Sequence, residues 1–377
     1  MNHEEPDRIP ALEVAFYSDT IKKHYGMKVG GESSLKIVQY LPFRTRLVRK
    51  FLENPKIAVK SLIDSFKFYI KMKLDVGLTI VSNFPRNVIR GGFIDEYGRI
   101  MQYEKYKGDG TYILGYHGGH LHNFEDFEQW GVLDPQDEIR EVMLKATIEA
   151  QRELNNEIFA IPAVASVFEN TWEGFGLENF SKILAHPKEA QAIFDSRGEF
   201  TLEMTKIVTE HDIRAILLWD DYGFKNGLFT NPRHYRTYVF PWLKKICDTA
   251  HKKDCKVILH SDGDILELFE DIIQSGVDAL HPIEPTTANP EYNIFKLHAK
   301  YRDKITFIGN ISPAMLSTGK ITEIEEYSKK LIRELAPGGG YIFSSGHSIN
   351  PAVTLDRWLA VLNIREKYGQ YPIQVPD

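Results

Sequence analysis

The segment KVILHSDGDILELFEDII, residues 256–273, contains the pattern that decides the fold. An apolar run, Val257 to Leu259, stops abruptly at His260 and Asp262. Gly263 then permits a sharp turn of the backbone. The apolar residues that follow recur at helical spacing and form one face of an amphipathic segment. The segment therefore predicts a buried strand, a tight turn and a helix that covers the strand.

Short apolar segments of this kind recur through the whole chain. We expect strands at eight of them, namely 9–16, 76–82, 158–165, 213–220, 256–262, 278–284, 305–310 and 341–345. Helical patterns lie between them, including 135–156, 231–253, 323–335 and 355–368. Strands that alternate with helices predict an α/β fold, and eight such units predict a (β/α)8 TIM barrel. We expect one barrel domain over residues 1–377, with a doubly wound open sheet as the alternative.

Residues 85–133 do not fit between two barrel strands, and we expect them to form an insertion or lid. FIDEYGRIMQYEKY, residues 93–106, alternates and turns like a hairpin. GYHGGHLHNFEDFEQWG, residues 115–131, has the composition of a loop. Its histidines, of which His120 is our candidate for substrate contact, have a spacing that a metal site could also use.

Composition excludes several functional classes. The chain has 377 residues and a formal net charge of -6, so nucleic acid is not an expected partner. No apolar run approaches the length of a membrane helix, and the first residues do not resemble a signal peptide. We therefore expect a cytoplasmic protein without a membrane partner. The two cysteines, Cys247 and Cys255, are expected to be reduced thiols.

The active site of such a barrel lies at the carboxyl ends of its strands. Five consecutive predicted strands end in, or lead to, groups that can bind a metal or move a proton. These residues are Asp220, Asp221, His260, Asp262, His281, Glu284, Asn310, Ser344, Ser345 and His347.

His260 and Asp262 are two residues apart, so in an extended strand both side chains can face the barrel mouth and grip one cation. The alternative is that Asp262 caps the following turn and that His260 is an ordinary core histidine. Asp220 and Asp221 are adjacent, so only one is expected to enter the site. The other is expected to meet backbone amides of the following loop, YGFKNG. Glu284 is a candidate ligand or proton acceptor, or a carboxylate that orients its own loop.

Several motifs resemble those of the uroporphyrinogen decarboxylase superfamily, which includes cobalamin-dependent methyltransferases. They are EEPDRIP at 4–10, DEYGR at 95–99, LLWDDYG at 217–223, KVILHSDGDI at 256–265, SGVDALHPIEP at 275–285, GNISPAMLSTG at 309–319 and GGGYIFSSGHSI at 338–349. This resemblance also implies a (β/α)8 barrel. The Arg-rich N-terminal motif of the decarboxylases has no counterpart here.

The methyltransferase branch carries a zinc site of the form His-x-Cys…Cys, and its positions match His260, Asp262 and His347. Carboxylate and imidazole are harder ligands than thiolates, and they leave a metal more electrophilic. The resemblance therefore implies a metal-dependent methyltransferase that moves a methyl group from an O-methyl donor, such as a methoxy-arene, to a corrinoid on a separate protein.

On this interpretation the metal is Zn²⁺ or another divalent ion, and the chain could form a homo-oligomer. Asp221 and Glu284 are the expected catalytic residues, and Asp220, Asn310 and His120 are expected to bind substrate. A decarboxylase of a polycarboxylate is the alternative, for which Arg86, Arg90 and Lys225 are the available cations. A non-catalytic member of the family is a third possibility.

Overall fold

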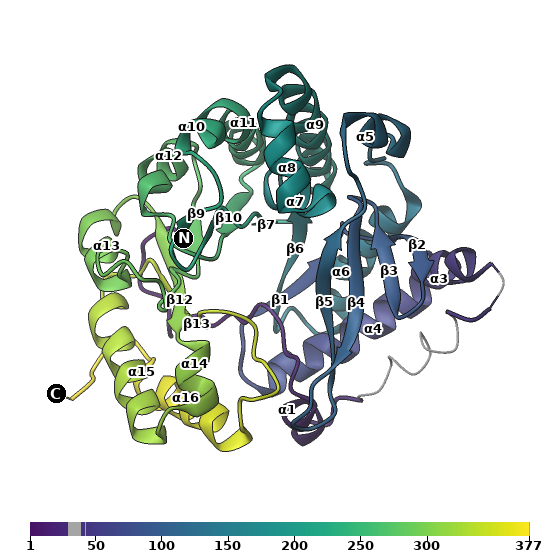
Figure 1. The fold of residues 1–377 in the computed structure, drawn as a ribbon. Helices are drawn as coiled ribbons and strands as arrows, with labels where there is room; N and C mark the ends of the chain where they lie inside the picture. Colours follow the sequence, from purple (N-terminus) through teal and green to yellow (C-terminus); the bar gives the residue numbers. More distant parts are fainter. Residues whose placement is uncertain (29–38, 42, 377) are drawn as a thin grey trace.

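A computed structural model describes residues 1–28, 39–41 and 43–376. Its centre is a seven-stranded parallel sheet whose strands are neighbours in chain order and curl into a barrel (Figure 1). The strands are β1 (Val76–Ile80), β6 (Phe159–Ala165), β7 (Ala215–Trp219), β10 (Lys256–His260), β11 (Ala279–His281), β12 (Thr306–Ile311) and β13 (Tyr341–Ser345). The predicted (β/α)8 architecture is confirmed.

Residues 9–16 occupy the eighth position of the barrel, but they do not form the predicted strand. The N–H of Leu12 donates to the carbonyl of Phe343 at 3.1 Å, and the carbonyl of Ala11 accepts from Asp75 at 2.9 Å. The segment thus lies between β13 and β1 and closes the barrel. A regular ladder fails because Pro10 has no N–H and because the Asp75 carboxylate takes the N–H of Ala11, at 2.7 Å.

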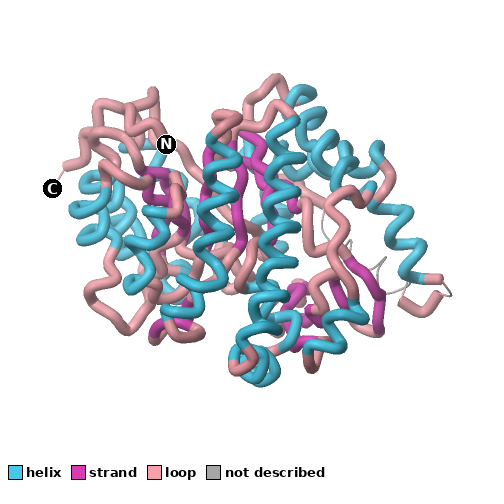
Figure 2. The backbone as a smooth tube through the Cα atoms, turned by 90° about the horizontal axis from the view of Figure 1, so that it is seen from above, coloured by secondary structure: helices cyan, strands magenta, loops and turns pink. Residues whose placement is uncertain are grey.

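The helices lie on the outside of the strands, as the view in Figure 2 also shows. The first three described helices are α1 (Asp19–His24), α3 (Arg44–Leu52) and α4 (Pro55–Lys71). The later helices are α6 (Glu138–Glu153), α7 (Glu169–Phe175), α8 (Leu177–Leu184), α9 (Pro187–Glu210), α10 (Pro232–His234), the π-helix η1 (Tyr235–Val239), α11 (Phe240–His251), the 3-10 turn η2 (Leu266–Leu268), α12 (Phe269–Gln274), α13 (Ile294–Tyr301), α14 (Pro313–Thr318), α15 (Ile321–Leu335) and α16 (Leu355–Tyr368).

Two helix starts differ from the sequence prediction. Helix α6 begins after Asp137, whose carboxylate accepts the N–H of Ile139 at 3.1 Å. Asp134, the residue before the predicted start at 135, accepts the N–H of Gln136 in a preceding turn at 2.9 Å. Helix α15 begins two residues earlier than expected, because the Glu323 side chain accepts the N–H of Lys320 at 3.1 Å. Capping depends on which carboxylate reaches the free amides, and spacing alone does not settle that choice.

The predicted insertion is confirmed as a four-stranded antiparallel sheet with a short helix. It comprises β2 (Pro85–Ile89), β3 (Gly92–Asp95), β4 (Arg99–Lys105), β5 (Tyr112–Gly119) and α5 (Phe124–Trp130). The hairpin prediction was right, but the loop prediction for 115–131 was wrong. The end of β5 packs closely on α7, where the N–H of Leu121 donates to the carbonyl of Gly174 at 3.0 Å.

Apolar side chains fill the barrel interior. They come from alternate strand positions and include Leu217, Ile258, Ala279 and Ile308. The intervening side chains, such as Leu259 and Leu280, pack against the outer helices. The next inward position after Ile258 is His260, and the one after Ala279 is His281, so both imidazoles face the barrel axis.

Cys247 and Cys255 are buried free thiols. Within the described part of the chain, none of the helices combines the length and the apolar character that crossing a membrane requires.

Candidate metal centre

Three predicted site residues converge at the carboxyl ends of β7 and β10. Asp221, His260 and Asp262 each offer a ligand atom, and these atoms lie within 4.8 Å of one another. His260 Nε2 is 3.7 Å from Asp221 Oδ1 and 3.8 Å from Asp262 Oδ2. The three atoms therefore surround a space in which a single cation could contact all of them.

His347, the third predicted metal ligand, lies at the edge of this cluster. Its Nε2 is 3.3 Å from Asp262 Oδ2, and its side chain is 53% exposed. Asp221, which was predicted to be catalytic, lies as close to His260 Nε2 as the predicted ligand Asp262 does, at 3.7 and 3.8 Å. The structure brings together all four residues, and it places Asp221 where it can act as the further ligand that was one of its two expected roles.

The position of Asp262 depends on close backbone packing. Its N–H donates to Asp221 Oδ1 at 2.7 Å, which ties the two acids together. Gly263 follows with a φ of +84°, and a Cβ there would lie 2.2 Å from the carbonyl carbon of Gly223. Asp264 fills the local capping role, since it accepts the N–H of Leu266 at 3.1 Å.

The electrostatics of the cluster fit a cation. Asp262 Oδ1 is buried and has no hydrogen-bond partner among the described residues. Burial and the neighbouring carboxylates raise the pKa of Asp221, of Asp262 and of Glu169. Burial lowers the pKa of His260 well below its ordinary value, so this imidazole does not neutralise the acids. A divalent ion would supply the missing positive charge.

Glu169 is a residue of this region that the sequence analysis missed. It is the first residue of α7, and its Oε2 accepts the N–H of Asp221 at 3.2 Å. It follows the strand β6, so a list of polar residues after every predicted strand, the third included, would have found it. The contact links α7, and through it the insertion, to the acidic cluster.

Asp220 points away from the cluster and is completely buried. Its carboxylate accepts the N–H groups of Val167, Phe168 and Glu169 at 3.2, 2.8 and 2.8 Å. One aspartate of the pair does meet backbone amides, as expected, but these lie at the N-terminus of α7 and are not in the loop YGFKNG. This geometry favours a scaffolding role for Asp220, and its contact with substrate stays a prediction.

Asn310, near the end of β12, and Glu284, in the loop after β11, lie at the carboxyl ends of neighbouring strands. The Nδ2 of Asn310 donates to the carbonyl of Ile283 at 2.7 Å, and its Oδ1 accepts from Tyr327 at 2.8 Å. Glu284 Oε1 accepts from the N–H and the hydroxyl of Thr286, at 3.2 and 2.5 Å. Both residues therefore orient local structure, and the catalytic role of Glu284 and the substrate contact of Asn310 stay predictions.

The histidines of 117–122 lie on the insertion and do not converge. His117 contacts Glu104 at 3.0 Å, and His122 contacts Asp126 at 3.0 Å. The ring of His120 lies against Trp130, with 5.0 Å between centroids. Among the described residues, this motif does not form a cluster of metal-ligating side chains. Contact of His120 with substrate stays a prediction.

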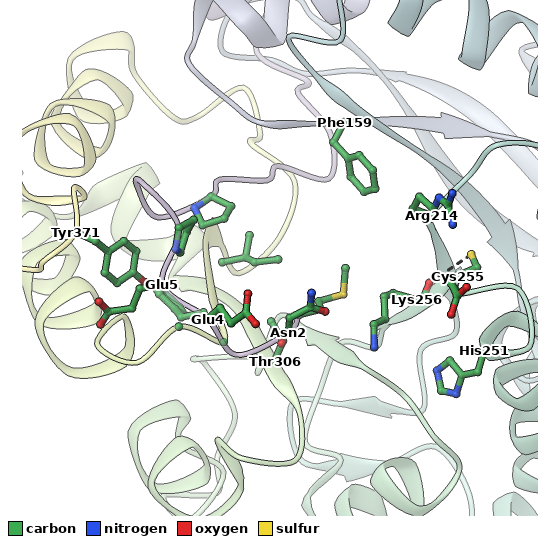
Figure 3. Close-up of a pocket in the computed structure, with 18 residues that line it drawn as sticks. Asn2, Glu4, Glu5, Phe159, Arg214, His251, Cys255, Lys256, Thr306 and Tyr371 are labelled. Carbon is green, nitrogen blue, oxygen red and sulfur yellow. Dashed lines mark hydrogen bonds between the residues drawn. The ribbon is translucent and has the colours of Figure 1, made fainter.

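A cavity of about 790 Å³ lies at the opposite end of the barrel (Figure 3). Its lining includes Phe159, Lys256, Thr306 and Tyr341, which are the first residues of four barrel strands. It also includes residues near the N-terminus of the chain. The cavity is therefore separate from the acidic cluster at the carboxyl ends.

Comparison with known proteins identifies the family. Residues 116–368 match the family model described as Uroporphyrinogen decarboxylase (URO-D). The uroporphyrinogen decarboxylase of Colwellia psychrerythraea is 25% identical over 244 residues, which cover 61% of this chain and 65% of that protein. That of Vibrio vulnificus is 25% identical over 237 residues, covering 60% and 63%. This chain thus spans less than two thirds of the length of these relatives.

A solved structure described as a methyltransferase from Methanosarcina mazei has a similar fold. It aligns with a TM-score of 0.67 at 14% identity and covers 97% of this chain and 96% of its own. The likeness extends over nearly the whole barrel and its insertion, and at this identity it concerns the fold alone. The family model matches more than half of the chain and includes the strands that carry the acidic cluster. This protein belongs to the uroporphyrinogen decarboxylase family.

Proposed function

We propose that the protein is a metal-dependent methyltransferase that moves a methyl group from an O-methyl donor, of the methoxy-arene type, to a corrinoid on a separate protein. The observation that carries this proposal is the oxygen-rich cluster of Asp221, His260 and Asp262 at the barrel mouth. Its single imidazole and two carboxylates form a hard ligand set, which suits activation of an oxygen rather than a thiol.

Asp221, His260 and Asp262 would hold the ion, with His347 beside Asp262 as a further ligand. Zn²⁺ is the ion that the family resemblance favours. When bound, a divalent ion supplies Lewis acidity to the ether oxygen of the donor. The ring of Trp219 lies edge-on to His260, at 5.0 Å between centroids, and provides an apolar wall beside the ligands.

The proposed methyl transfer needs no reactant besides the O-methyl donor, the corrinoid and a proton. The bond between the donor oxygen and the methyl carbon breaks, and the oxygen keeps the electron pair. The corrinoid on the partner protein, as cob(I)alamin, would supply the electron pair for the new bond to the methyl carbon and would formally pass from Co(I) to Co(III). The released alkoxide or phenolate takes up a proton. We assign the exchange of that proton to Glu284, which accepts a hydrogen bond from Thr286, with Asp221 as the alternative.

Decarboxylation of a polycarboxylate is the second candidate, because the family and its curated relatives are named for it. Such a substrate needs cationic side chains at the site, whereas this cluster is acidic. The guanidinium of Arg86 lies on the ring of Trp130, 4.2 Å from its centroid, within the insertion. Arg90 follows β2, and Lys225 lies in the short hairpin of β8 (Gly223–Phe224) and β9 (Gly227–Leu228). The charge of the cluster thus supports the methyltransferase.

Metal content of the purified protein tests the proposal. We expect about one divalent ion per chain by elemental mass spectrometry, lost in both His260→Ala and Asp262→Ala. His122→Ala is the matched control, because it removes an exposed histidine of the insertion and should keep the ion. The metal-loaded enzyme should then demethylate a methoxybenzoate in the presence of free cob(I)alamin. A metal-replete preparation without bound ion would refute the mechanism, and release of CO2 from a polycarboxylate would favour the second candidate.

A further inference from the structure

His260 and His281 form a buried pair of imidazoles whose nitrogens are in direct contact. The two residues occupy the same level of neighbouring strands, β10 and β11. The planes of the two rings are inclined by 24°, and the two Nδ1 atoms are 2.7 Å apart. At that distance one Nδ1 must carry a hydrogen and the other must accept it.

The surroundings of His281 determine which ring donates. Its Nε2 lies 3.3 Å from the carbonyl oxygen of Ser345, which can only accept. The hydrogen of His281 therefore sits on Nε2, where the Ser344 hydroxyl, at 3.4 Å, can accept as well. Burial of both rings disfavours a charged imidazolium, so Nδ1 of His281 has no hydrogen. His260 must then donate from its own Nδ1.

This assignment leaves Nε2 of His260 without a hydrogen, so that this nitrogen presents a lone pair. That lone pair faces Asp221 Oδ1 and Asp262 Oδ2, at 3.7 and 3.8 Å, and neither oxygen can donate to it while ionised. A neutral imidazole whose outer nitrogen is unprotonated is the form that binds metals. The opposite tautomer would instead place an N–H in the position where the ion is expected.

The carbonyl of Ser345 is itself held in place by Glu13. The N–H of Ser345 donates to Glu13 Oε1 at 2.9 Å. The Ser345 hydroxyl contacts the other carboxyl oxygen of Glu13 and also lies 2.5 Å from the carbonyl of His347. One hydroxyl hydrogen cannot serve both oxygens, so a protonated Glu13 donates to Ser345 Oγ, which donates to His347.

We propose that His281, oriented by the Glu13–Ser345 pair, is a positioning residue that fixes His260 in the tautomer with hydrogen on Nδ1 and so keeps Nε2 free for a divalent cation. The cation itself rests on the proposed function, whereas the tautomer is a property of the metal-free protein. His281 acts through His260 and does not need to touch the metal or the substrate.

Nuclear magnetic resonance of metal-free protein with isotope-labelled histidine tests the tautomer directly. The His260 signals are identified by their loss in His260→Gln. We expect the protonated nitrogen of His260 to be Nδ1 and that of His281 to be Nε2. An Nε2-protonated His260 in the wild-type protein would overturn the proposal, and this result needs no variant of His281 to fold.

Two substitutions of His281 separate its hydrogen bonds from its volume. His281→Gln provides an amide oxygen for His260 and an NH2 group for Ser345, whereas His281→Phe provides neither. In competition titrations with Zn²⁺, we expect His281→Phe to bind about 10- to 100-fold more weakly. His281→Gln should remain near the wild-type affinity. His298→Phe, at a buried histidine on α13, is the matched control and should not alter Zn²⁺ affinity.

The outcomes distinguish this inference from the proposed function. Equal Zn²⁺ affinity in His281→Phe and the wild-type protein would refute a positioning role. A wild-type protein that does not bind Zn²⁺ would refute the proposed metal centre, while the resonance experiment would still decide the tautomer. Thermal unfolding of each variant shows whether a change in affinity merely follows a loss of folded protein.

Discussion

The backbone N–H of Asp262 donates to the carboxylate of Asp221 at 2.7 Å, so two acids from neighbouring strands are locked side by side. This bond holds both carboxylates near His260 although their negative charges repel each other. The arrangement is unfavourable in the metal-free protein and becomes favourable when a cation binds between them. Under the proposed function, the cluster lowers the stability of the metal-free fold and in exchange provides affinity for a metal.

The substitution Asp221→Asn tests whether the cluster lowers the stability of the metal-free fold and provides affinity for a metal. The amide oxygen can still accept the N–H of Asp262, but one buried charge is removed. Because burial and Asp262 raise the pKa of Asp221, we expect the metal-free variant to be at least as stable as the wild type at neutral pH. At a Zn²⁺ concentration about 100-fold above Kd the wild type should gain about 2.7 kcal/mol. The variant should gain clearly less in thermal unfolding, and an equal gain would contradict the assignment. Asp212→Asn, at an exposed acid, is the control.

Glu13→Gln should change how stability depends on pH. Burial raises the pKa of Glu13 to about 8, from an ordinary value of 4.5. The folded state keeps this proton while the unfolded state loses it, so the wild type loses stability as pH rises from 4.5 to about 8. By pH 7, this difference in pKa lowers the free energy of unfolding by about 3 kcal/mol relative to its value at low pH.

The glutamine variant cannot ionise, so its stability relative to the wild type should increase across that pH range. Chemical denaturation at several pH values measures this difference. Glu326→Gln, at an exposed position, should leave the pH profile unchanged. A constant difference between Glu13→Gln and the wild type would mean that Glu13 is ionised in the folded protein.

Gly263→Ala should displace Asp262. Gly263 has a φ of +84°, and a Cβ there would lie 2.2 Å from the carbonyl carbon of Gly223. Gly131 has a φ of +81° with open space around it, so Gly131→Ala carries the backbone strain without the clash. The strain costs of the order of 1–3 kcal/mol in each variant. We expect Gly263→Ala to lose more stability in urea unfolding, and Zn²⁺ affinity as well. Equal effects of the two substitutions would argue against a tight backbone contact.

Arg99→Leu should weaken the attachment of the insertion to the barrel. Arg99 donates to Asp95 at 2.6 Å and to Glu173 on α7 at 2.7 Å, and all three side chains are largely buried. Removing the cation leaves two buried acids unpaired, which should cost about 3–5 kcal/mol. Urea unfolding measures the loss. Arg302→Leu, at an exposed pair with Asp303, should have little effect.

Local pattern was sufficient for most of the barrel, because strands buried on both faces appear as short apolar runs. The strand prediction for 9–16 was wrong because the Asp75 carboxylate accepts the N–H of Ala11, which a strand ladder would use. Asp75 is 64 residues from Ala11 in the sequence, so the local pattern could not reveal this bond. The predicted ligands His260 and Asp262 do come together, although Asp262 lies beyond the end of β10 and is held there by its bond to Asp221. Glu169 and Glu13 were missed for a different reason. The position of Glu169 after a predicted strand was a usable signal, but its pairing with Asp221, 52 residues away, was not encoded locally. The pairing of Glu13 with Ser345, 332 residues away, has no local signal either.

The segment that closes the barrel also carries Glu13, whose bonds to Ser345 join the two ends of the chain across 332 residues. Contacts at such separation carry a large entropic cost of loop closure, so we expect them to form late in folding. The imidazole pair beneath the acidic cluster therefore gains its final hydrogen-bond partner only when the barrel is complete. In a nascent or partly unfolded chain, the same acids and histidine would lack this fixed geometry. Tight binding of a metal would therefore indicate that the barrel is fully assembled.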